Sequence, residues 1–585
     1  MEELIVGIDL GTTNSEVAVV RNGKMEMIPV SGDRPILPSV VGIGENGALL
    51  VGEEARNQYV LHPERTVRSI KRRMGEFAKV VMGEESYSPQ EISAMILSRL
   101  KQAAEQFLGR PVRKAVITVP AYFSDAQRQA TREAGEIAGL EVVRILNEPT
   151  AAALSYEKLM ESARRVLVYD LGGGTFDVSV VNIEGEVVEV LASHGNNHLG
   201  GDDFDQKIVD FALDHLRDLH GTDLRGNPVV MSRLLRAAEE AKIALSAQPF
   251  AVLSEEYLFE KEGVPVHLSL EISRTEYEEM IGDYIDETLN AVHISVKNAR
   301  LTVSDIDEVL LVGGSTRTPA IVRRLEEDLG KMPRFEVDPD LCVAMGAAVQ
   351  AAVIAGEGVP RVLVDVTPYS FGISVLGFLE DGTEYPKCYA PVIWKNTPIP
   401  VTRSEAFRTV SDGQKKVEIT VYQGEDPDAL RNIEIGQFYV EGLRDVPAGN
   451  LVVVSFSLDL DGLLQVSARE KETGLECSIA IDRAVDRFGQ EEIDQSRDRV
   501  SRFFAEGEEG EFEEESGPGS DPGERQERIR SLRERSDRLL ETLTGEDRED
   551  LLDRVAGMID AMDGPGEELE KAVRELEDLL FYLEA

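Results

Sequence analysis

The first apolar segment of the chain, residues 4–8, leads into a short polar loop, and a second apolar segment follows at residues 17–20. Two apolar segments joined by a loop that contains glycine predict a pair of strands with a tight turn. The loop, within the sequence GIDLGTTNS at 7–15, holds Asp9, Gly11 and a run of small hydroxyl and amide side chains. Glycine lets backbone N–H groups approach a ligand oxygen, so such a turn can bind phosphate. An acid beside a phosphate also needs a cation, most often Mg²⁺.

The same pattern occurs a second time, around the sequence DLGGGTFD at residues 170–177. Equal spacing aligns the two loops residue by residue: Asp9 with Asp170, Gly11 with Gly172, and Glu16 with Asp177. An internal repeat of this kind predicts two similar strand–loop–strand units. Facing each other, the two units would hold a phosphate chain and a metal ion from both sides.

Strands and helices alternate through the rest of the first 358 residues, which predicts an α/β domain. The expected elements are helices at 88–108, at 125–138 with Ser124 as cap, at 234–246 and at 345–355, and strands at 115–119 and 309–312. The pattern GxxxxGK[ST] is absent from the sequence, so a nucleotide would be bound without that phosphate loop.

Three further features are candidate nucleotide contacts, and each has an ordinary structural alternative. Lys71, in the sequence SIKRRMG, is either a phosphate contact or a surface lysine. Glu148 precedes a proline at the start of an alanine-rich helix, where it would face a metal ion or a water, or cap the helix. A later helix places Glu239, Lys242 and Ser246 along one side, which suits either a ribose and base or a solvated surface.

The composition changes near residue 360. We predict a linker at 359–366, and residues 367–484 alternate apolar and polar positions, which predicts an antiparallel β domain with one apolar face. A charged amphipathic helix is expected within 485–504. Residues 505–524 carry nine acids and no bases, which predicts disorder, and 525–585 resume as amphipathic helices that form a bundle.

The charge of the chain limits its partners. The 585 residues include 62 basic and 108 acidic ones, a net charge of −46, so a phosphate backbone would be repelled. No apolar stretch is long enough to span a membrane, and Glu2 and Glu3 stand where a signal peptide would be basic. The three scattered cysteines provide neither a disulfide framework nor metal-ligand spacing. We therefore expect a cytoplasmic protein that binds neither nucleic acid nor membranes.

Eleven motifs follow one another in order along the chain. They are GIDLGTTNS, VPAYFSDAQRQAT, NEPTAAAL, DLGGGTFD, HLGGDDFD, EEAKIALS, VGGSTRTP and AMGAAVQAA, followed by DVTP, KNTPIP and YQGE. Together these motifs resemble the DnaK-type, 70-kDa heat-shock chaperone family. The resemblance implies an actin-like, two-lobed ATPase domain at 1–358 and a β-sandwich peptide-binding domain at 367–484. It also implies a helical lid, formed by a first helix within 485–504 and a bundle at 525–585.

The resemblance implies a role for each matching residue of the ATP site. Lys71, Glu148, Asp170 and Thr175 would be catalytic, with Lys71 orienting the attacking water and offsetting charge on the transferred phosphoryl group. Mg²⁺ and associated K⁺ ions would be surrounded by Asp9, Asp170 and Asp177. ATP or ADP would be held by Asp9, Gly11, Thr12, Thr13, Asn14, Gly172, Gly173, Gly174, Gly200, Gly201, Glu239, Lys242, Ser246, Gly313, Gly314, Ser315, Arg317 and Asp340.

The resemblance also implies a peptide site and a route of coupling. The pocket for one aliphatic side chain falls on Ile373, Phe407, Val417, Ile419 and Val452, and the arch over the peptide backbone falls on Leu376 and Val410. Ordinary sheet core is the alternative for these residues. Coupling is assigned to Pro120 and Arg128, between the ATP site and the domain surface, and to Leu363 and Asp365 in the linker.

The chain departs from the family pattern at several places. The linker has Arg361 where the family usually has an apolar residue, and the loop after Leu376 is longer and contains Cys388. Leu341 and Cys342 replace the usual Glu-Ala. The lid matches weakly and is interrupted by the acidic segment. In these departures the chain resembles specialised bacterial side branches of the family, in particular HscC-like proteins.

We therefore expect an ATP-dependent chaperone that binds extended hydrophobic peptides, with hydrolysis of ATP to ADP controlling peptide affinity. The partners implied are a J-domain co-chaperone and a GrpE-type nucleotide-exchange factor. One alternative is a phosphotransferase that resembles actin or the sugar kinases. The others are a scaffold that binds ATP but barely hydrolyses it, and a specialised assembly chaperone with narrow clients. The domain after residue 360 argues against a kinase, and the intact Lys71, Glu148 and Thr175 argue against a scaffold.

Overall fold

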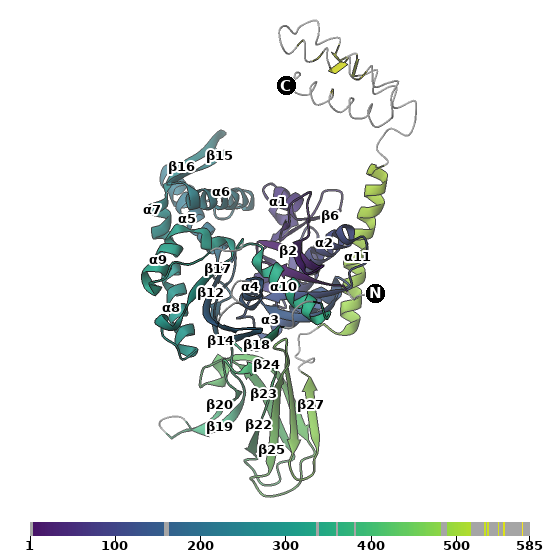
Figure 1. Ribbon diagram of the computed structural model, residues 1–585, viewed down its shortest axis with the longest axis vertical. Helices are drawn as coiled ribbons and strands as arrows, with labels where there is room; N and C mark the ends of the chain where they lie inside the picture. The colour runs from purple at the N-terminus through teal and green to yellow at the C-terminus, as the bar shows by residue number, and fades with distance from the viewer. Residues whose placement is uncertain are drawn as a thin grey trace. The chain divides into compact units, whose positions relative to one another are not determined.

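The computed structural model describes residues 4–156, 163–334, 338–357, 361–378, 382–480 and 488–515, and isolated positions from 532 to 576. Contacts divide the chain into two compact units, residues 1–502 and 503–585. The first unit carries every predicted site residue (Figure 1). Most of the predicted helices at 525–585 lie outside the described residues.

A mixed sheet forms the centre of the first lobe of the α/β domain. Strand β1 pairs in parallel with β10 and antiparallel with β2, and β1 is buried along its whole length, as its apolar sequence predicts. The strands run in the order β11 (Glu141–Asn147), β10 (Lys114–Val119), β1 (Ile5–Leu10), β2 (Asn14–Arg21) and β3 (Lys24–Met27), with β4 (Ile36–Pro38) beside β2.

The second lobe is built on a sheet of similar design. Its central hairpin of β12 and β13 is antiparallel, and β17 joins β12 in parallel. The strands run in the order β17 (Glu308–Val312), β12 (Arg164–Leu171), β13 (Phe176–Glu184), β14 (Val187–Asn196), β18 (Val362–Val366) and β21 (Pro398–Ile399).

The internal repeat occupies equivalent registers in the two sheets. Asp9 lies opposite Glu16 across β1 and β2, and Asp170 lies opposite Asp177 across β12 and β13. The alignment of the two sequences therefore gives the spatial equivalence of the two hairpins, and the predicted repeat is confirmed.

Helices cover the two sheets, and their starts follow from local sequence. Capping boxes formed by Ser88 with Glu91 and by Ser124 with Gln127 begin two of them. The helices are α1 (Glu53–Tyr59), α2 (Pro89–Leu108), α3 (Asp125–Ile137), α4 (Glu148–Ser155), α5 (Gly201–His220), α6 (Pro228–Ala247), α7 (Arg274–Met280), α8 (Gly282–Asn298), α9 (Pro319–Leu329) and α10 (Cys342–Ile354). Within the described part of the chain, no helix has both the length and the apolar character needed to cross a membrane.

Further strands complete the two lobes. They form a three-stranded sheet and two hairpins: β5 (Val40–Ile43), β6 (Leu49–Val51) and β7 (Thr66–Arg68); β8 (Val80–Met82) and β9 (Glu85–Tyr87); β15 (Phe250–Lys261) and β16 (Val264–Ser273).

Helix α10 packs unusually closely on its neighbours. A Cβ atom on Gly7 would lie 2.1 Å from the backbone nitrogen of Ala348, and one on Gly346 would lie 1.7 Å from the carbonyl oxygen of Ala151. The small residues of α10 therefore bring its backbone against β1 and α4. This contact restricts the sideways movement of α4.

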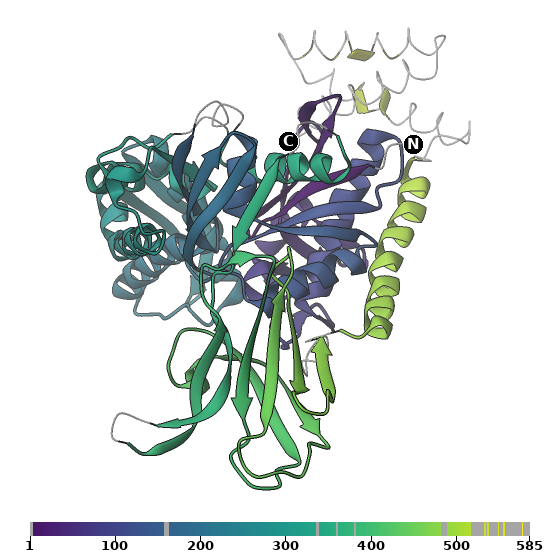
Figure 2. The same cartoon turned by 60° about the horizontal axis from the view of Figure 1, so that its bottom comes forward.

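Two four-stranded sheets form the β domain, and their inner faces make one apolar core (Figure 2). Strand β25 alternates half-buried and buried residues along its length, as its sequence predicts. One sheet consists of β20 (Glu384–Ile393), β19 (Phe371–Phe378), β23 (Lys416–Gln423) and β24 (Ile433–Glu441). The other consists of β22 (Val401–Arg408), β25 (Leu451–Leu458), β26 (Leu464–Glu470) and β27 (Glu476–Ala480). With the α/β lobes before it and helix α11 after it, this domain confirms the predicted fold class.

The predicted linker is ordered in the structure from residue 361 onward. Its residues form strand β18, which pairs in parallel with β14 of the second lobe and antiparallel with β21. The apolar side chains of β18 suit a sheet position, and the sheet accounts for the backbone hydrogen bonds that a free linker would leave to water. Residues 358–360 lie outside the described residues.

The first part of helix α11 (Gln490–Glu515), up to Arg502, lies beside the first lobe in both cartoon views (Figures 1 and 2). Arg497 donates to the carbonyl of Glu136, and Arg499 pairs with Glu85 and Glu91. The helix continues to Glu515, into the segment that the sequence predicts as disordered. Glutamate is a strong helix former, so an acid-rich sequence that follows an established helix extends it at low cost.

Candidate functional site

Three glycine loops converge on one cavity of about 360 Å³. They follow β1, β12 and β17, and two of them touch: a Cβ atom on Gly173 would lie 1.8 Å from Oγ1 of Thr13. Gly313 has φ +80°, and a Cβ atom there would lie 2.4 Å from the carbonyl oxygen of Leu171. Only glycine tolerates such approaches, so the glycines set the spacing of the loops.

The cavity collects most of the residues that the sequence predicts for the nucleotide. It is lined by Asp9, Gly11, Thr12, Thr13, Asn14, Lys71, Glu148, Asp170, Gly172, Gly173, Thr175, Glu239, Lys242, Ser246, Gly313, Gly314, Ser315, Arg317 and Asp340. Four predicted residues, Gly174, Gly200, Gly201 and Asp177, do not line it. The sequence analysis missed Glu16 as a lining residue, although the repeat aligns it with Asp177.

Lys71 and Glu148 form a buried ion pair at this cavity. Lys71 lies on a 3₁₀ turn (Ile70–Arg73), and Glu148 is the first residue of α4. The Lys71 ammonium donates to Oε1 of Glu148, and its side chain is only 4% exposed. Burial disfavours the charged form of Lys71 and lowers its pKa. The negative charges of Glu148 and Asp9 outweigh this effect, so the pKa of Lys71 is raised. Lys71 is therefore a charged group inside the site, and the surface alternative is excluded.

Four further carboxylates surround this ion pair: Asp9, Glu16, Asp170 and Asp177. Burial raises the pKa of each of them, and for Asp177 it does so to about 7. The site therefore holds an excess of acidic groups, which favours cations from solution. Among the described residues, no three His, Cys, Asp or Glu side chains converge to ligate a metal by themselves.

Acidic neighbours hold the two cations predicted for the adenosine end. The ammonium of Lys242 on α6 donates to Asp205 at 2.9 Å, and the guanidinium of Arg317 donates to Asp338 and Asp340 at 2.7 and 2.9 Å. These acids fix the two side chains, so that their stems and the flat guanidinium face are available to a nucleoside.

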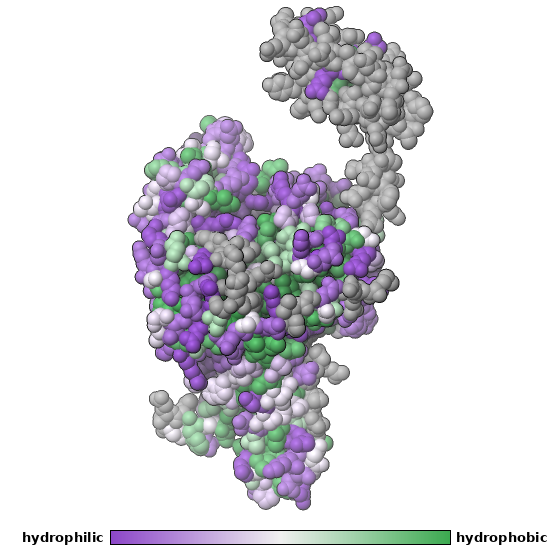
Figure 3. Space-filling view, viewed as in Figure 1, coloured by the Kyte–Doolittle hydropathy of each residue, from purple (hydrophilic) through white to green (hydrophobic). Residues whose placement is uncertain are grey.

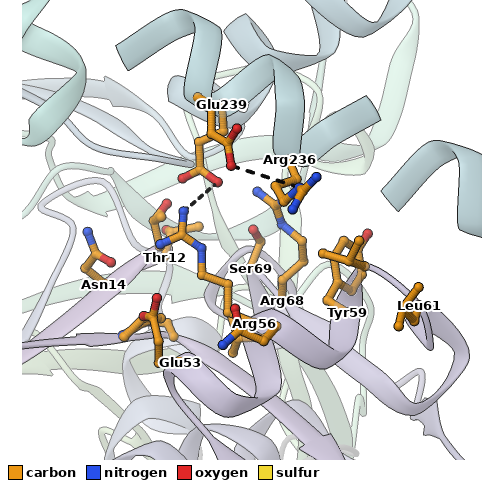
Figure 4. Close-up of a pocket in the computed structure, with 17 residues that line it drawn as sticks. Thr12, Asn14, Glu53, Arg56, Tyr59, Leu61, Arg68, Ser69, Arg236 and Glu239 are labelled. Carbon is orange, nitrogen blue, oxygen red and sulfur yellow. Dashed lines mark hydrogen bonds and ion pairs between the residues drawn. The ribbon is translucent and has the colours of Figure 1, made fainter. Parts of the chain in front are cut away.

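An ion pair crosses the entrance of the nucleotide cavity, beside a second cavity of about 460 Å³ (Figure 4). Nη2 of Arg56 on α1 lies 3.2 Å from Oε2 of Glu239 on α6. Thr12 and Asn14 line both cavities, so the second is an extension of the first. The Arg56–Glu239 pair therefore joins the two lobes over the site.

We expect an Arg56→Ala variant to release ADP about two- to fivefold faster than the wild type, because an ion pair that is partly exposed is worth up to about 1 kcal/mol. The side chains of Arg56 and Glu239 are 40% and 14% exposed, and Glu239 keeps its electrostatic interaction with Arg68 when Arg56 is lost. Dissociation of a fluorescent ADP analogue measures the rate. Arg21→Ala, which removes an exposed ion pair away from the cavity, is the matched control. An unchanged release rate for Arg56→Ala would contradict the prediction.

A chain of hydrogen bonds leads from Asp177 to the base of α4. The carboxylate of Asp177 accepts from the amides of the two residues after Pro120, at 3.0 and 3.1 Å. Arg128 donates to the carbonyl of Ala121 at 3.0 Å and to Oδ1 of Asn147 at 2.7 Å. The structure thus brings the predicted coupling residues together next to Glu148.

The linker strand attaches to the same place. Oδ2 of Asp365 accepts from Nδ2 of Asn147 at 2.9 Å and from Oγ1 of Thr150 at 3.0 Å. Leu363 packs, partly buried, against the core that includes α4 and α10. Both predicted linker residues therefore contact the ATPase domain.

Asp461, in the turn between β25 and β26 of the β domain, makes a further contact that is not among the predicted ones. Its Oδ1 accepts from the amide of Ile145 at 3.0 Å and lies 3.3 Å from Nε of Arg144, and its other oxygen pairs with Arg132. An acid in a turn gives no sequence signal for such a contact. We call the contacts of Asp365 and Asp461 with the ATPase domain the docked arrangement.

The residues predicted for the peptide site divide into buried and exposed groups. Ile373, Ile419 and Val452 belong to the core of the β domain, and Phe407 and Val417 pack against it partly buried. The two predicted arch residues, Leu376 and Val410, are 45% and 62% exposed. Figure 3 shows apolar and polar patches side by side on this domain, at the bottom of the view.

Comparisons with known proteins agree with this geometry. A model of the family described as Hsp70 protein matches residues 5–581. The protein named Chaperone protein DnaK of Thermotoga neapolitana is 48% identical over 489 residues, which cover 82% of this chain and 80% of that protein. Those of Thermosipho africanus and Thermosipho melanesiensis are 47% and 46% identical, with the same shares covered. The chain belongs to the Hsp70 family and is an ATP-dependent chaperone with ATPase activity.

Proposed function

We propose that ATP stabilises the docked arrangement of this chaperone and that hydrolysis of ATP undoes it. The change in docking changes the affinity of the β domain for a peptide. One observation carries the proposal: a single helix, α4, begins with Glu148 at the ATP cavity and holds Asp365 of the linker through Asn147 and Thr150. A change at the terminal phosphate therefore acts on the same helix that anchors the linker.

We propose catalytic roles for Lys71, Glu148, Asp170 and Thr175, all of which line the cavity. The buried Lys71 ammonium would offset charge that develops on the transferred phosphoryl group, which is the main demand of phosphoryl transfer. Lys71 would also orient the attacking water, and Glu148 would hold Lys71 in place.

We propose that Mg²⁺ and K⁺ accompany ATP at this site. The excess of buried acids, with Asp9 and Asp170 lining the cavity, fits cations held jointly with phosphate oxygens and water. Bound there, the cations would neutralise phosphate charge. Asp177 would act at longer range, because the backbone after Pro120 already occupies both of its oxygens.

The ligand of the β domain is an extended hydrophobic peptide in this proposal, with the arch residues Leu376 and Val410 over its backbone. A J-domain co-chaperone and a GrpE-type exchange factor are proposed as partners, and the cytoplasm as the location. The domain limits given by the sequence (1–358, 359–366 and 367–484) and the likeness to HscC-like proteins remain predictions.

Release of a fluorescent apolar peptide from the full chain, with and without ATP, tests the proposal. We expect ATP to speed dissociation by at least tenfold over ADP. The ratio of these two rates is called the coupling factor below. A coupling factor of one would refute the proposal, and phosphorylation of a small molecule during ATP turnover would favour the kinase alternative.

We expect acid to weaken the docked arrangement through His194. Its Nδ1 lies 3.4 Å from the Lys395 ammonium of the β domain, and its ring packs edge-on against Tyr122. Burial and, as a smaller cause, the positive charge of Lys395 lower the pKa of His194 from 6.5 to about 4. The undocked protein then binds a proton that the docked protein does not, so docking weakens as pH falls below about 6.5. Between pH 7.5 and 5.8 the coupling factor should fall about fivefold.

A His194→Asn variant tests this pH dependence, because it removes the titrating ring and keeps a polar side chain. The other titratable groups around the pair are Tyr122, Tyr369, Glu425 and Asp177, and all of them remain in the variant. Its coupling factor should stay constant over the same range. An equal fall in the variant and the wild type would show that another group titrates.

A further inference from the structure

We infer that Arg361 is a positioning residue for the ATP site, acting through helix α4. It binds the C-terminal end of the helix whose N-terminal residue is Glu148, so that strand β18 and the residue directly before it hold α4 at both ends. The inference rests on the coupling proposed above, and it assigns a role to the residue at which the linker departs most clearly from the family pattern.

The contact at the C-terminal end is direct. Nη1 of Arg361 donates to the carbonyl oxygen of Leu154 at 2.7 Å, and α4 ends one residue later, at Ser155. Leu154 is 1% exposed, so water has little access to this part of the helix end. The last carbonyls of a helix lack partners within the helix, and a guanidinium is well suited to satisfy one of them.

The contact at the other end is made by the same strand. Asp365 accepts from Asn147 and Thr150, at the N-terminus of α4. From Arg361 to Asp365 an extended strand covers about 13 Å, and a helix of the length of α4 covers about 12 Å. The segment 361–365 therefore matches the helix in length, and its two charged residues reach the two ends together.

The two charges match the helix electrostatically. A helix carries partial positive charge at its N-terminus and partial negative charge at its C-terminus. Asp365 lies at the positive end and Arg361 at the negative end, so both ion–dipole interactions are favourable. An apolar residue in place of Arg361 would keep the strand pairing of β18 but lose this second attachment.

Because helix α4 is closely packed on α10, the attachments at its two ends can fix its position. The backbone of α4 contacts α10 at Gly346, where a Cβ atom would lie 1.7 Å from the carbonyl oxygen of Ala151. Helix α4 therefore has little lateral freedom, and its remaining movement is along or about its axis. A hold at both ends restricts that movement and thereby fixes Glu148 beside Lys71. The hold exists only while the linker lies on the ATPase domain.

An Arg361→Met variant tests the inference, with Arg361→Lys as the conservative variant and Val362→Thr as the matched control. Val362 follows Arg361 as the first residue of β18 and is 54% exposed. We expect Arg361→Met to lower the coupling factor about three- to tenfold, the range for losing a charge-assisted hydrogen bond that is partly exposed. Arg361→Lys should restore most of the coupling, and Val362→Thr should match the wild type.

Three measurements separate positioning from a structural defect. Arg361→Met should change kcat for ATP hydrolysis while KM for ATP, the affinity for peptide without nucleotide and the melting temperature stay the same. A kcat equal to that of the wild type would overturn the positioning role of Arg361. If ATP does not change the rate of peptide release from the wild type, the proposed coupling is wrong, and this inference is wrong with it. Coupling that is present in the wild type and fully retained in Arg361→Met would overturn the inference alone.

Discussion

A Lys71→Met variant will hydrolyse ATP about 10²- to 10³-fold more slowly than the wild type, yet ATP will still speed its release of peptide. Lys71 is the one cation that contacts Glu148 at the cavity among the described residues, and its loss removes charge stabilisation of the transition state. Methionine fills the volume of the buried stem without the charge. Glu148 then takes up a proton, because burial already raises the pKa of its carboxyl group.

Single-turnover hydrolysis of radiolabelled ATP measures the chemical step, and the peptide-release assay measures coupling in the same preparation. Arg73→Met is the matched control, because Arg73 lies on the same 3₁₀ turn and pairs with Glu76 at the surface. The control should hydrolyse ATP at the wild-type rate. Hydrolysis by Lys71→Met within threefold of the wild type would show that the catalytic assignment is wrong.

The second large effect is expected for Asp461→Ala, which should lower the coupling factor about 10- to 100-fold. The Asp461 side chain is only 13% exposed and bridges Arg132, Arg144 and the amide of Ile145. Its removal leaves a buried amide and two cations without their acceptor, so the docked arrangement loses much of its stability. ATP hydrolysis should continue, because the ATP cavity is unchanged.

Asp445→Ala is the control for this variant, because Asp445 is an exposed acid, 71% accessible, in another loop of the β domain. Peptide affinity in the absence of nucleotide should be the same for both variants and the wild type. If Asp461→Ala kept the full coupling factor, the turn between β25 and β26 would not contribute to docking. A loss of peptide affinity without nucleotide would instead indicate damage to the β domain itself.

The nucleotide cavity could be predicted from sequence because its determinants are local. Each glycine loop follows an apolar strand, and the aligned acids Asp9 and Asp170 take equivalent places in two hairpins of equal register. The capping boxes at Ser88 and Ser124 likewise start helices within a residue of the predicted position. Patterns of a few residues suffice for such features.

The docked arrangement could not be predicted in the same way. Asp461 meets Ile145 across a sequence separation of 316 residues, and Arg361 meets Leu154 across 207. Such contacts depend on how two folded domains lie against each other, and neither residue type nor spacing encodes that. The acidic segment shows a related limit: composition predicts disorder from residue 505, but the helix that precedes it continues to Glu515.

The equal registers of the two hairpins have a consequence for the origin of the ATPase domain. If the two repeats are separated as independent chains, each presents one phosphate loop and two buried acids, which is half of a site. Two copies joined face to face around a twofold axis would complete it, in the manner of an isologous dimer. The present chain holds both halves of this arrangement in one polypeptide. The halves differ in one respect: Lys71, the proposed catalytic lysine, belongs to the first.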